Sequence, residues 1–295
     1  MTKNELNQYN QFLLKHIELT RKRAIRPLYR GDSLKNLCKK LNVNYNYEKT
    51  DIKTIVKRLF MVGEKAKRYY LDGTEFSIDT IDNHVFEKIA TYFENSLGNS
   101  KPYIASFFNR NTDLKKFFSD QNNRQLFSET INNADASEKL IIRNYYLTLL
   151  HQLATLNYKN KSHFVSTSED YEIAQEFSNY DKNPNRVILH CWQPIKRQKS
   201  IIKKHNLPSH LFDPFPFQKE TSLLGGIFPH FIWAIEITLN NKSSFHLNPA
   251  IFKNVITDKL FINGLEIDQS NFDDIINLTK YKRTIITDGI NMWEQ

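Results

Sequence analysis

The stretch KSHFVSTSEDYEIAQEFS, residues 161–178, predicts the junction between a strand and a helix. Two apolar residues at 164–165 precede three hydroxyl side chains, Ser166, Thr167 and Ser168, and apolar residues then recur every three to four positions. One interpretation makes Ser168 an ordinary helix N-cap, followed by acidic residues that suit the helix dipole. The other interpretation is that the three hydroxyls hold a ligand or a catalytic group, and the rest of the chain has to decide between the two.

Composition indicates a globular protein with a substantial core. The chain has 295 residues, of which 40% are hydrophobic and 13% aromatic, and only 8 glycines and 9 prolines. Its formal charge of +9 favours attraction to polyanions, although charge alone does not establish nucleic-acid binding.

The residue inventory gives no support for a metal site, a disulfide framework or a membrane span. Two cysteines, Cys38 and Cys191, favour a reducing compartment, and the scattered histidines lack ligand spacing. The first residues contain no apolar signal core, and no apolar run approaches the roughly 20 residues that cross a bilayer. We therefore expect a cytoplasmic protein, or one delivered into the cytosol of a target cell, with no metal and no membrane partner.

Hydrophobic periodicity predicts an α+β fold. An amphipathic helix is expected over 5–23 and should be stopped by Pro27, and a short buried strand should follow at 28–30. Residues 50–158 have mostly helical spacing and are expected to form a helical insertion or accessory subdomain within a single domain of 1–295. Strand-like text rich in Ile, Val and aromatics follows, at NRVILHCWQPI, HFIWAIEITL and RTIITDGINMW.

A second site-like stretch covers residues 209–237. Its loop carries two prolines and the rings of Phe215 and Phe217, and then leads through Gln218 and Glu220 into a strand. Apolar rings on such a loop need a partner, which is either the protein core or a ligand. In the plain structural interpretation, the rings pack under the sheet and Glu220 is a solvated strand residue.

Three fragments follow one another along the chain: an Arg in the first strand, hydroxyls at a strand-to-helix junction and a Glu at the start of a late strand. Their sequences are LYRG around Arg30, FVSTS with AQEF at 164–177, and QKETSLLGGIFPHF at 218–231. In this order they resemble the Arg–Ser–Glu branch of the ADP-ribosyltransferase family, of the toxin and effector type. The resemblance implies an ADP-ribosyltransferase-like mixed β core, with NAD as substrate, and leaves the long helical segment unaccounted for.

The resemblance also implies roles for the site residues. Glu220 would stabilise the positive charge that develops on the ribose when the bond to nicotinamide breaks. Arg30 would hold phosphate or the adjoining ribose, and backbone groups of Gly31 would bind the nicotinamide amide. Ser166 would orient Glu220 and contact the nicotinamide ribose, while Thr167 and Ser168 brace the junction.

Two further residues are weaker candidates for NAD binding. The family has a phosphate-contacting loop after the junction helix, where Arg186 lies in this chain, and Tyr180 is placed to stack on the nicotinamide. A lone Arg and a lone Tyr in a loop are, in the plain interpretation, surface residues.

The acceptor of ADP-ribose is expected to be a macromolecule. The family places an acceptor-side residue two positions before the Glu, and Gln218 at that position disfavours arginine as the acceptor. A nucleic-acid base is slightly favoured over a non-arginine protein side chain, because Phe215 and Phe217 follow a basic stretch. The members of that stretch are Lys196, Arg197, Lys199, Lys203 and Lys204.

Other readings of the chain stay open at this point. One is an NAD glycohydrolase that transfers to water, and another is a non-catalytic nucleotide-binding or interaction module. If the chain is a toxin, as the resemblance implies, a cognate antitoxin or immunity protein is the expected partner.

Overall fold

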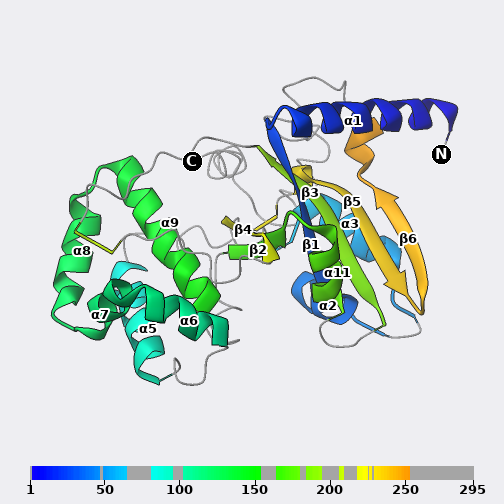
Figure 1. Cartoon of the computed structure of the whole chain (residues 1–295). Helices are drawn as coiled ribbons and strands as arrows, with labels where there is room; N and C mark the ends of the chain where they lie inside the picture. The colour runs from blue at the N-terminus through cyan, green and yellow to red at the C-terminus, as the bar shows by residue number, and fades with distance from the viewer. Residues whose placement is uncertain are drawn as a thin grey trace. The chain divides into compact units, whose positions relative to one another are not determined.

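The computed structural model combines α-helices with an antiparallel sheet whose strands do not follow the chain order, which confirms the α+β class (Figure 1). It describes residues 2–46, 49–64, 81–95, 102–153, 164–179, 184–194, 206–208, 218–224, 226–227 and 229–252. The chain divides into two compact units. The first comprises residues from 1–73, 165–196 and 218–295, and the second comprises residues from 74–164 and 197–217.

The described part of the first unit is built on a six-stranded sheet with the order β4-β2-β1-β3-β5-β6. Strand β1 pairs antiparallel with both β2 and β3, and β5 pairs antiparallel with β3 and β6. The strands are β1 (Ile25–Ser33), β2 (Phe164–Ser168), β3 (Arg186–Pro194), β4 (Glu220–Leu224), β5 (Ile232–Leu239) and β6 (Lys242–Leu247). This order makes neighbours of the three strands that carry the Arg, hydroxyl and Glu fragments.

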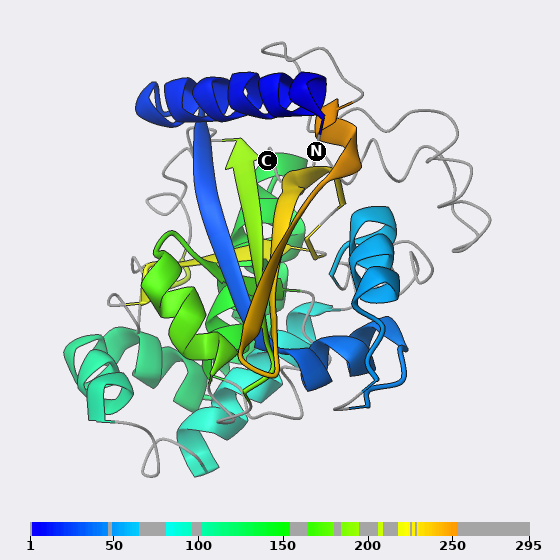
Figure 2. The same cartoon turned by 90° about the vertical axis from the view of Figure 1, so that its right-hand side faces the viewer.

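Helices cover both faces of this sheet. Figure 2 shows α11 on one side, α2 and α3 on the other, and α1 running across one end of the strands. These helices are α1 (Lys3–Arg21), α2 (Leu34–Leu41), α3 (Ile52–Val62) and α11 (Tyr171–Ser178). Between α2, α3 and the sheet lies an apolar core made of Leu28, Leu37, Ile55, Leu59, Leu189 and Ile235.

Strand register decides which side chains share a face. Gly31 pairs with Ile188 and Ser33 with Arg186, so these four residues lie on the α11 face. Arg30 precedes Gly31 on β1 and pairs with Leu189, so its side chain projects to the opposite face, toward α2 and α3.

The second unit is helical where it is described. Its helices are α5 (Ile81–Asn95), α6 (Pro102–Arg110), α7 (Thr112–Ser119), α8 (Asn123–Asn133) and α9 (Ala136–Leu153). Aromatic rings form its core, with Phe86 5.2 Å from Phe118 and Phe127 5.1 Å from Tyr146, between ring centroids. The buried Tyr146 hydroxyl donates a hydrogen bond to the Pro208 carbonyl at 2.7 Å, which holds residues 206–208 against α9.

Several sequence expectations about these elements need correction. Helix α1 ends at Arg21, and Pro27 lies inside β1, so the prediction that Pro27 stops the helix is wrong. Helix α3 falls in the first unit, although residues 50–158 were expected to form one helical segment. Helices α6 and α8 lie within the segment that was expected to be mostly helical, strand β6 was not predicted, and the strand expected at 283–293 lies outside the described residues. Among the described helices, none combines the length and the apolar character needed to cross a membrane.

Candidate functional site

Arg30, Ser166 and Glu220 come from three adjacent strands of one sheet. The Arg30 guanidinium donates from Nη1 to the backbone carbonyl of Ser166 at 3.1 Å. The Glu220 carboxylate lies near enough for its charge to raise the pKa of Arg30. Glu220 also accepts a hydrogen bond from the Ser222 hydroxyl at 2.8 Å, which orients the carboxylate from within β4. The sheet therefore brings together the three residues that the sequence singled out.

The junction hydroxyls tie β2 to the segment that carries Glu220. Thr167 Oγ1 donates to the Thr221 carbonyl at 2.6 Å, and Ser168 Oγ donates to the Gln218 carbonyl at 2.7 Å. Both hydroxyl residues are buried, so the two bonds are shielded from competing water. They fix the backbone on both sides of Glu220, in agreement with the bracing role expected for Thr167 and Ser168.

The N-cap of α11 is Asp170, whose side chain accepts from the backbone N–H of Glu172 at 3.0 Å. The interpretation of Ser168 as the N-cap is therefore wrong. Ser168 Oγ instead accepts from the Asp170 backbone N–H at 3.0 Å while donating to Gln218. Asp170, two positions after Ser168, is also a residue type that caps helices, and the sequence pattern alone did not show which of the two is the N-cap.

Arg30 belongs to a compact group of charges. Its Nη2 lies 3.4 Å from Glu64 Oε1 and 3.5 Å from Asp32 Oδ2. Lys40 Nζ contacts the same two oxygens, at 2.8 Å from Glu64 Oε1 and closely at Asp32 Oδ2. Burial lowers the pKa of Arg30, but the charges of Glu64 and Asp32 outweigh burial and hold that pKa above its ordinary value. Arg30 is therefore a permanent cation.

Glu64 is the main site residue that sequence reasoning missed. Its side chain is only 1% exposed. Helix α3 ends at Val62 and is capped by Gly63, whose φ of 69° suits glycine, and Glu64 then pairs with Ile227 through two backbone hydrogen bonds of 2.9 Å. Glu64 is 34 positions from Arg30 and 24 positions from Lys40 in the sequence, so no local sequence signal could have indicated the cluster.

The charges around Arg30 do not form an anion site by themselves. Among the residues that the structure describes here, two cations, Arg30 and Lys40, face three carboxylates, those of Asp32, Glu64 and Glu220, which leaves one net negative charge. Such a surrounding opposes the approach of a pyrophosphate and favours a neutral or cationic group. Between the two roles expected for Arg30, the arrangement favours a contact with the ribose over one with phosphate.

Gly31 has a packing role in this structure. A Cβ atom on Gly31 would lie 1.7 Å from the carbonyl oxygen of Ala174 and 2.9 Å from the backbone nitrogen of Ser178, both in α11. Only a residue without a side chain lets α11 approach β1 this closely. Gly31 also pairs with Ile188 across the sheet. This close approach explains the glycine without a ligand.

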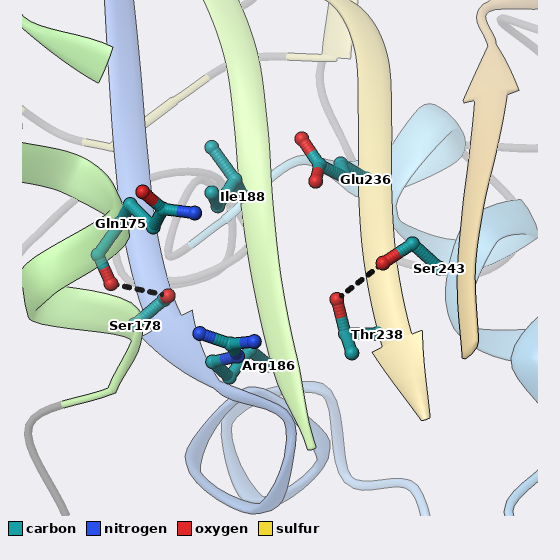
Figure 3. A pocket seen from close by; sticks show the side chains of 7 residues that line it. All are labelled: Gln175, Ser178, Arg186, Ile188, Glu236, Thr238 and Ser243. Carbon is teal, nitrogen blue, oxygen red and sulfur yellow. Dashed lines mark hydrogen bonds between the residues drawn. The ribbon is translucent and has the colours of Figure 1, made fainter. Parts of the chain in front are cut away.

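Arg186 is on the other face of the sheet from Arg30. It lines a pocket of about 70 Å³ together with residues of α11, β3, β5 and β6 (Figure 3), namely Gln175, Ser178, Ile188, Glu236, Thr238 and Ser243. This volume is a fraction of the 300–1,000 Å³ typical of ligand pockets and is too small for a dinucleotide. The structure therefore separates Arg186 from Arg30, with which it was grouped as an NAD ligand.

The remaining predicted site residues are only partly described. Gln218 is half-buried, and its carbonyl is the acceptor for Ser168, while the following residue, Lys219, has a φ of 44° and an ion pair of 3.1 Å with Asp170. This strained turn delivers the chain into β4 at Glu220. The other candidates lie outside the described residues: Tyr180, Phe215, Phe217, Lys196, Arg197, Lys199, Lys203 and Lys204.

Two chemistries find no support among the described residues. No group of three or more His, Cys, Asp or Glu side chains in this part of the chain is placed to hold a metal ion. Burial raises the pKa of the Cys191 thiol, which lies close to Glu64 and Arg30, well above its ordinary value, so the thiol stays protonated and is a poor nucleophile. Protein-family models, curated proteins and solved structures were compared with the chain, and none matches.

Proposed function

We propose that this chain is an NAD-dependent ADP-ribosyltransferase that moves ADP-ribose from NAD to a macromolecular acceptor. One observation carries the proposal: β4, β2 and β1 are neighbours, and they bring Glu220, the Ser166–Thr167–Ser168 run and Arg30 together. The order of these residues along the chain suggested the resemblance, and their meeting in space is independent of that order.

Glu220 carries the electrostatic part of the reaction. The bond between the nicotinamide nitrogen and ribose C1′ breaks, and its electron pair leaves with nicotinamide. An acceptor nucleophile then bonds to C1′ and gives up its proton to solvent. The positive charge that develops on the ribose is stabilised by the carboxylate of Glu220, which Ser222 holds in place. The net negative charge of the surrounding cluster acts in the same direction.

Arg30 and the junction hydroxyls position the sugar. Arg30 is held at its Nη1 by the Ser166 carbonyl at 3.1 Å, and two carboxylates lie at 3.4 and 3.5 Å from its Nη2, so its orientation is set before a substrate arrives. A fixed guanidinium loses little freedom on binding and suits a defined contact to a ribose oxygen. Thr167 and Ser168 keep the strand that carries Glu220 in register with β2.

The acceptor is proposed from Gln218 and from the charge of the chain. Gln218 stands two residues before Glu220, and its amide can pair with an amide or with the edge of a base. A net charge of +9 attracts nucleic acid over a long range. We therefore favour a nucleic-acid base as the acceptor.

Labelled NAD tests the function. NAD labelled in its adenylate part is incubated with the protein and whole-cell lysate, and the products are digested with nuclease or with protease. We expect transferred label that nuclease removes. Label removed only by protease would replace the nucleic acid with a protein side chain, and release of nicotinamide without transferred label would make the chain an NAD glycohydrolase. If NAD is not consumed, the proposal is wrong.

A further inference from the structure

Lys40 and Arg30 compete for the same two carboxylate oxygens. Arg30 Nη2 and Lys40 Nζ both contact Asp32 Oδ2 and Glu64 Oε1, so the four side chains form a closed ring of alternating charges. Lys40 reaches this ring from α2, Asp32 and Arg30 from β1, and Glu64 from the segment that follows α3. Residues from three elements therefore set the surroundings of one guanidinium.

The contacts in this ring are unequal. Arg30 lies 3.4 Å from Glu64 and 3.5 Å from Asp32, which is the outer limit of a hydrogen bond, whereas Lys40 lies 2.8 Å from Glu64 and is closer still to Asp32. Within this ring, the shorter contacts of both carboxylates are therefore those with Lys40. Arg30 keeps a shorter bond, at 3.1 Å, to the Ser166 carbonyl on the strand that carries the hydroxyl run.

We infer that Lys40 is a positioning residue, which holds Asp32 and Glu64 away from Arg30 so that the guanidinium stays directed toward Ser166 and Glu220. The expected effect on NAD binding rests on the proposed function, whereas the expected effect on the orientation of Arg30 does not depend on it. Without the ammonium group of Lys40, the two acids have Arg30 as their remaining cation in this ring. Short ion pairs to Arg30 would then form, and the guanidinium would turn away from Ser166.

Removal of Lys40 also changes the charge of the site. The group of Arg30, Lys40, Asp32, Glu64 and Glu220 would go from one to two net negative charges. The turned guanidinium would lose its contact with the ribose, and the added negative charge would repel the pyrophosphate, so both changes would weaken NAD binding.

Lys40→Met tests the inference, with Lys40→Arg as the rescue and Lys39→Met as the matched control. Lys39 precedes Lys40 on α2 and is exposed, with no side-chain contact to the cluster. NAD binding is measured by calorimetry on a Glu220→Gln background, which suppresses turnover. We expect Lys40→Met to weaken NAD binding about tenfold or more, Lys40→Arg to restore most of it, and Lys39→Met to change it less than twofold.

A second readout follows Arg30 without NAD. The Arg30 Nε atom is buried, so its N–H group gives a protected signal in ¹⁵N NMR hydrogen-exchange measurements. We expect Lys40→Met to shift this signal and speed its exchange, with Lys40→Gln used in the same way if the Met variant does not fold. An unchanged Arg30 signal in the folded variant would overturn the inference, as would a changed signal with unaltered NAD affinity. If the parent protein does not bind NAD, the proposed function fails, and the Arg30 signal still decides whether Lys40 positions Arg30.

Discussion

Gly31→Ala tests whether the glycine beside Arg30 is required for packing. The added Cβ would lie 1.7 Å from the Ala174 carbonyl oxygen, and Cβ contacts closer than 3.0 Å are essentially never seen. Helix α11 would have to move by about 1.3 Å, the difference between these two separations. The obstacle is helix backbone, so no rotamer change relieves it, and α11 begins only three residues after β2.

The expected change in the free energy of unfolding on Gly31→Ala follows from two opposing effects. Overpacking of a filled interior costs about 1–3 kcal/mol, and a backbone obstacle places this site at the upper end. Alanine reduces the freedom of the unfolded chain, which returns about 0.4–1 kcal/mol. We therefore expect Gly31→Ala to lower the free energy of unfolding by about 2 kcal/mol.

Urea unfolding followed by tryptophan fluorescence measures this change. Trp192 in β3 and Trp233 in β5 belong to the first unit, so their fluorescence reports the unit that contains Gly31. Lys35→Ala, at an exposed position of α2, is the control and should change the free energy by less than about 0.5 kcal/mol. A Gly31→Ala protein as stable as the parent would refute the packing argument and return Gly31 to its expected role in binding the nicotinamide amide.

Three further predictions concern the same unit. Burial lowers the pKa of His16 to about 4 from 6.5, so unfolding takes up a proton between these values; stability should fall by roughly 3 kcal/mol as pH drops from 6.5 to 4, and His16→Gln should flatten the loss in urea melts over that range. Thr167→Val removes the 2.6 Å bond to the Thr221 carbonyl and should lower the free energy of unfolding by about 1 kcal/mol; no change would mean that the hydroxyl does not brace β4. Ser222→Ala removes the 2.8 Å hydrogen bond to the Glu220 carboxylate and should lower kcat for nicotinamide release about tenfold with little change in KM; an unaltered kcat would refute this positioning role.

The elements were predictable where periodicity and local chemistry agree. The strand at 164–168, the helix after it and the strand that starts at Glu220 all follow from apolar spacing and adjacent caps or turns. Pro27 misled the prediction because it lies inside β1, whereas the helix before it ends at Arg21, before the strand begins at Ile25.

The site was predictable only as far as its three chain fragments. Glu64 and Lys40 reach Arg30 through the packing of α2 and α3 on the sheet, and neither carries a local motif. The separation of Arg186 from Arg30 depends on strand register, in which Arg186 pairs with Ser33 and so takes the opposite face. Without the strand register, the sequence does not show on which face of the sheet the Arg186 side chain lies.

Nicotinamide release from NAD by the parent protein and by Glu220→Gln tests the central claim most directly. The substitution keeps the size of the side chain and removes the charge that stabilises the ribose cation. We expect the parent to release nicotinamide and Glu220→Gln to be slower by about a hundredfold or more, on the order of 3 kcal/mol. Glu176→Gln, an exposed carboxylate on α11, should leave the rate unchanged. No release by the parent protein, or comparable release by a folded Glu220→Gln protein, would contradict the claim that this sheet forms an NAD-cleaving site around Glu220.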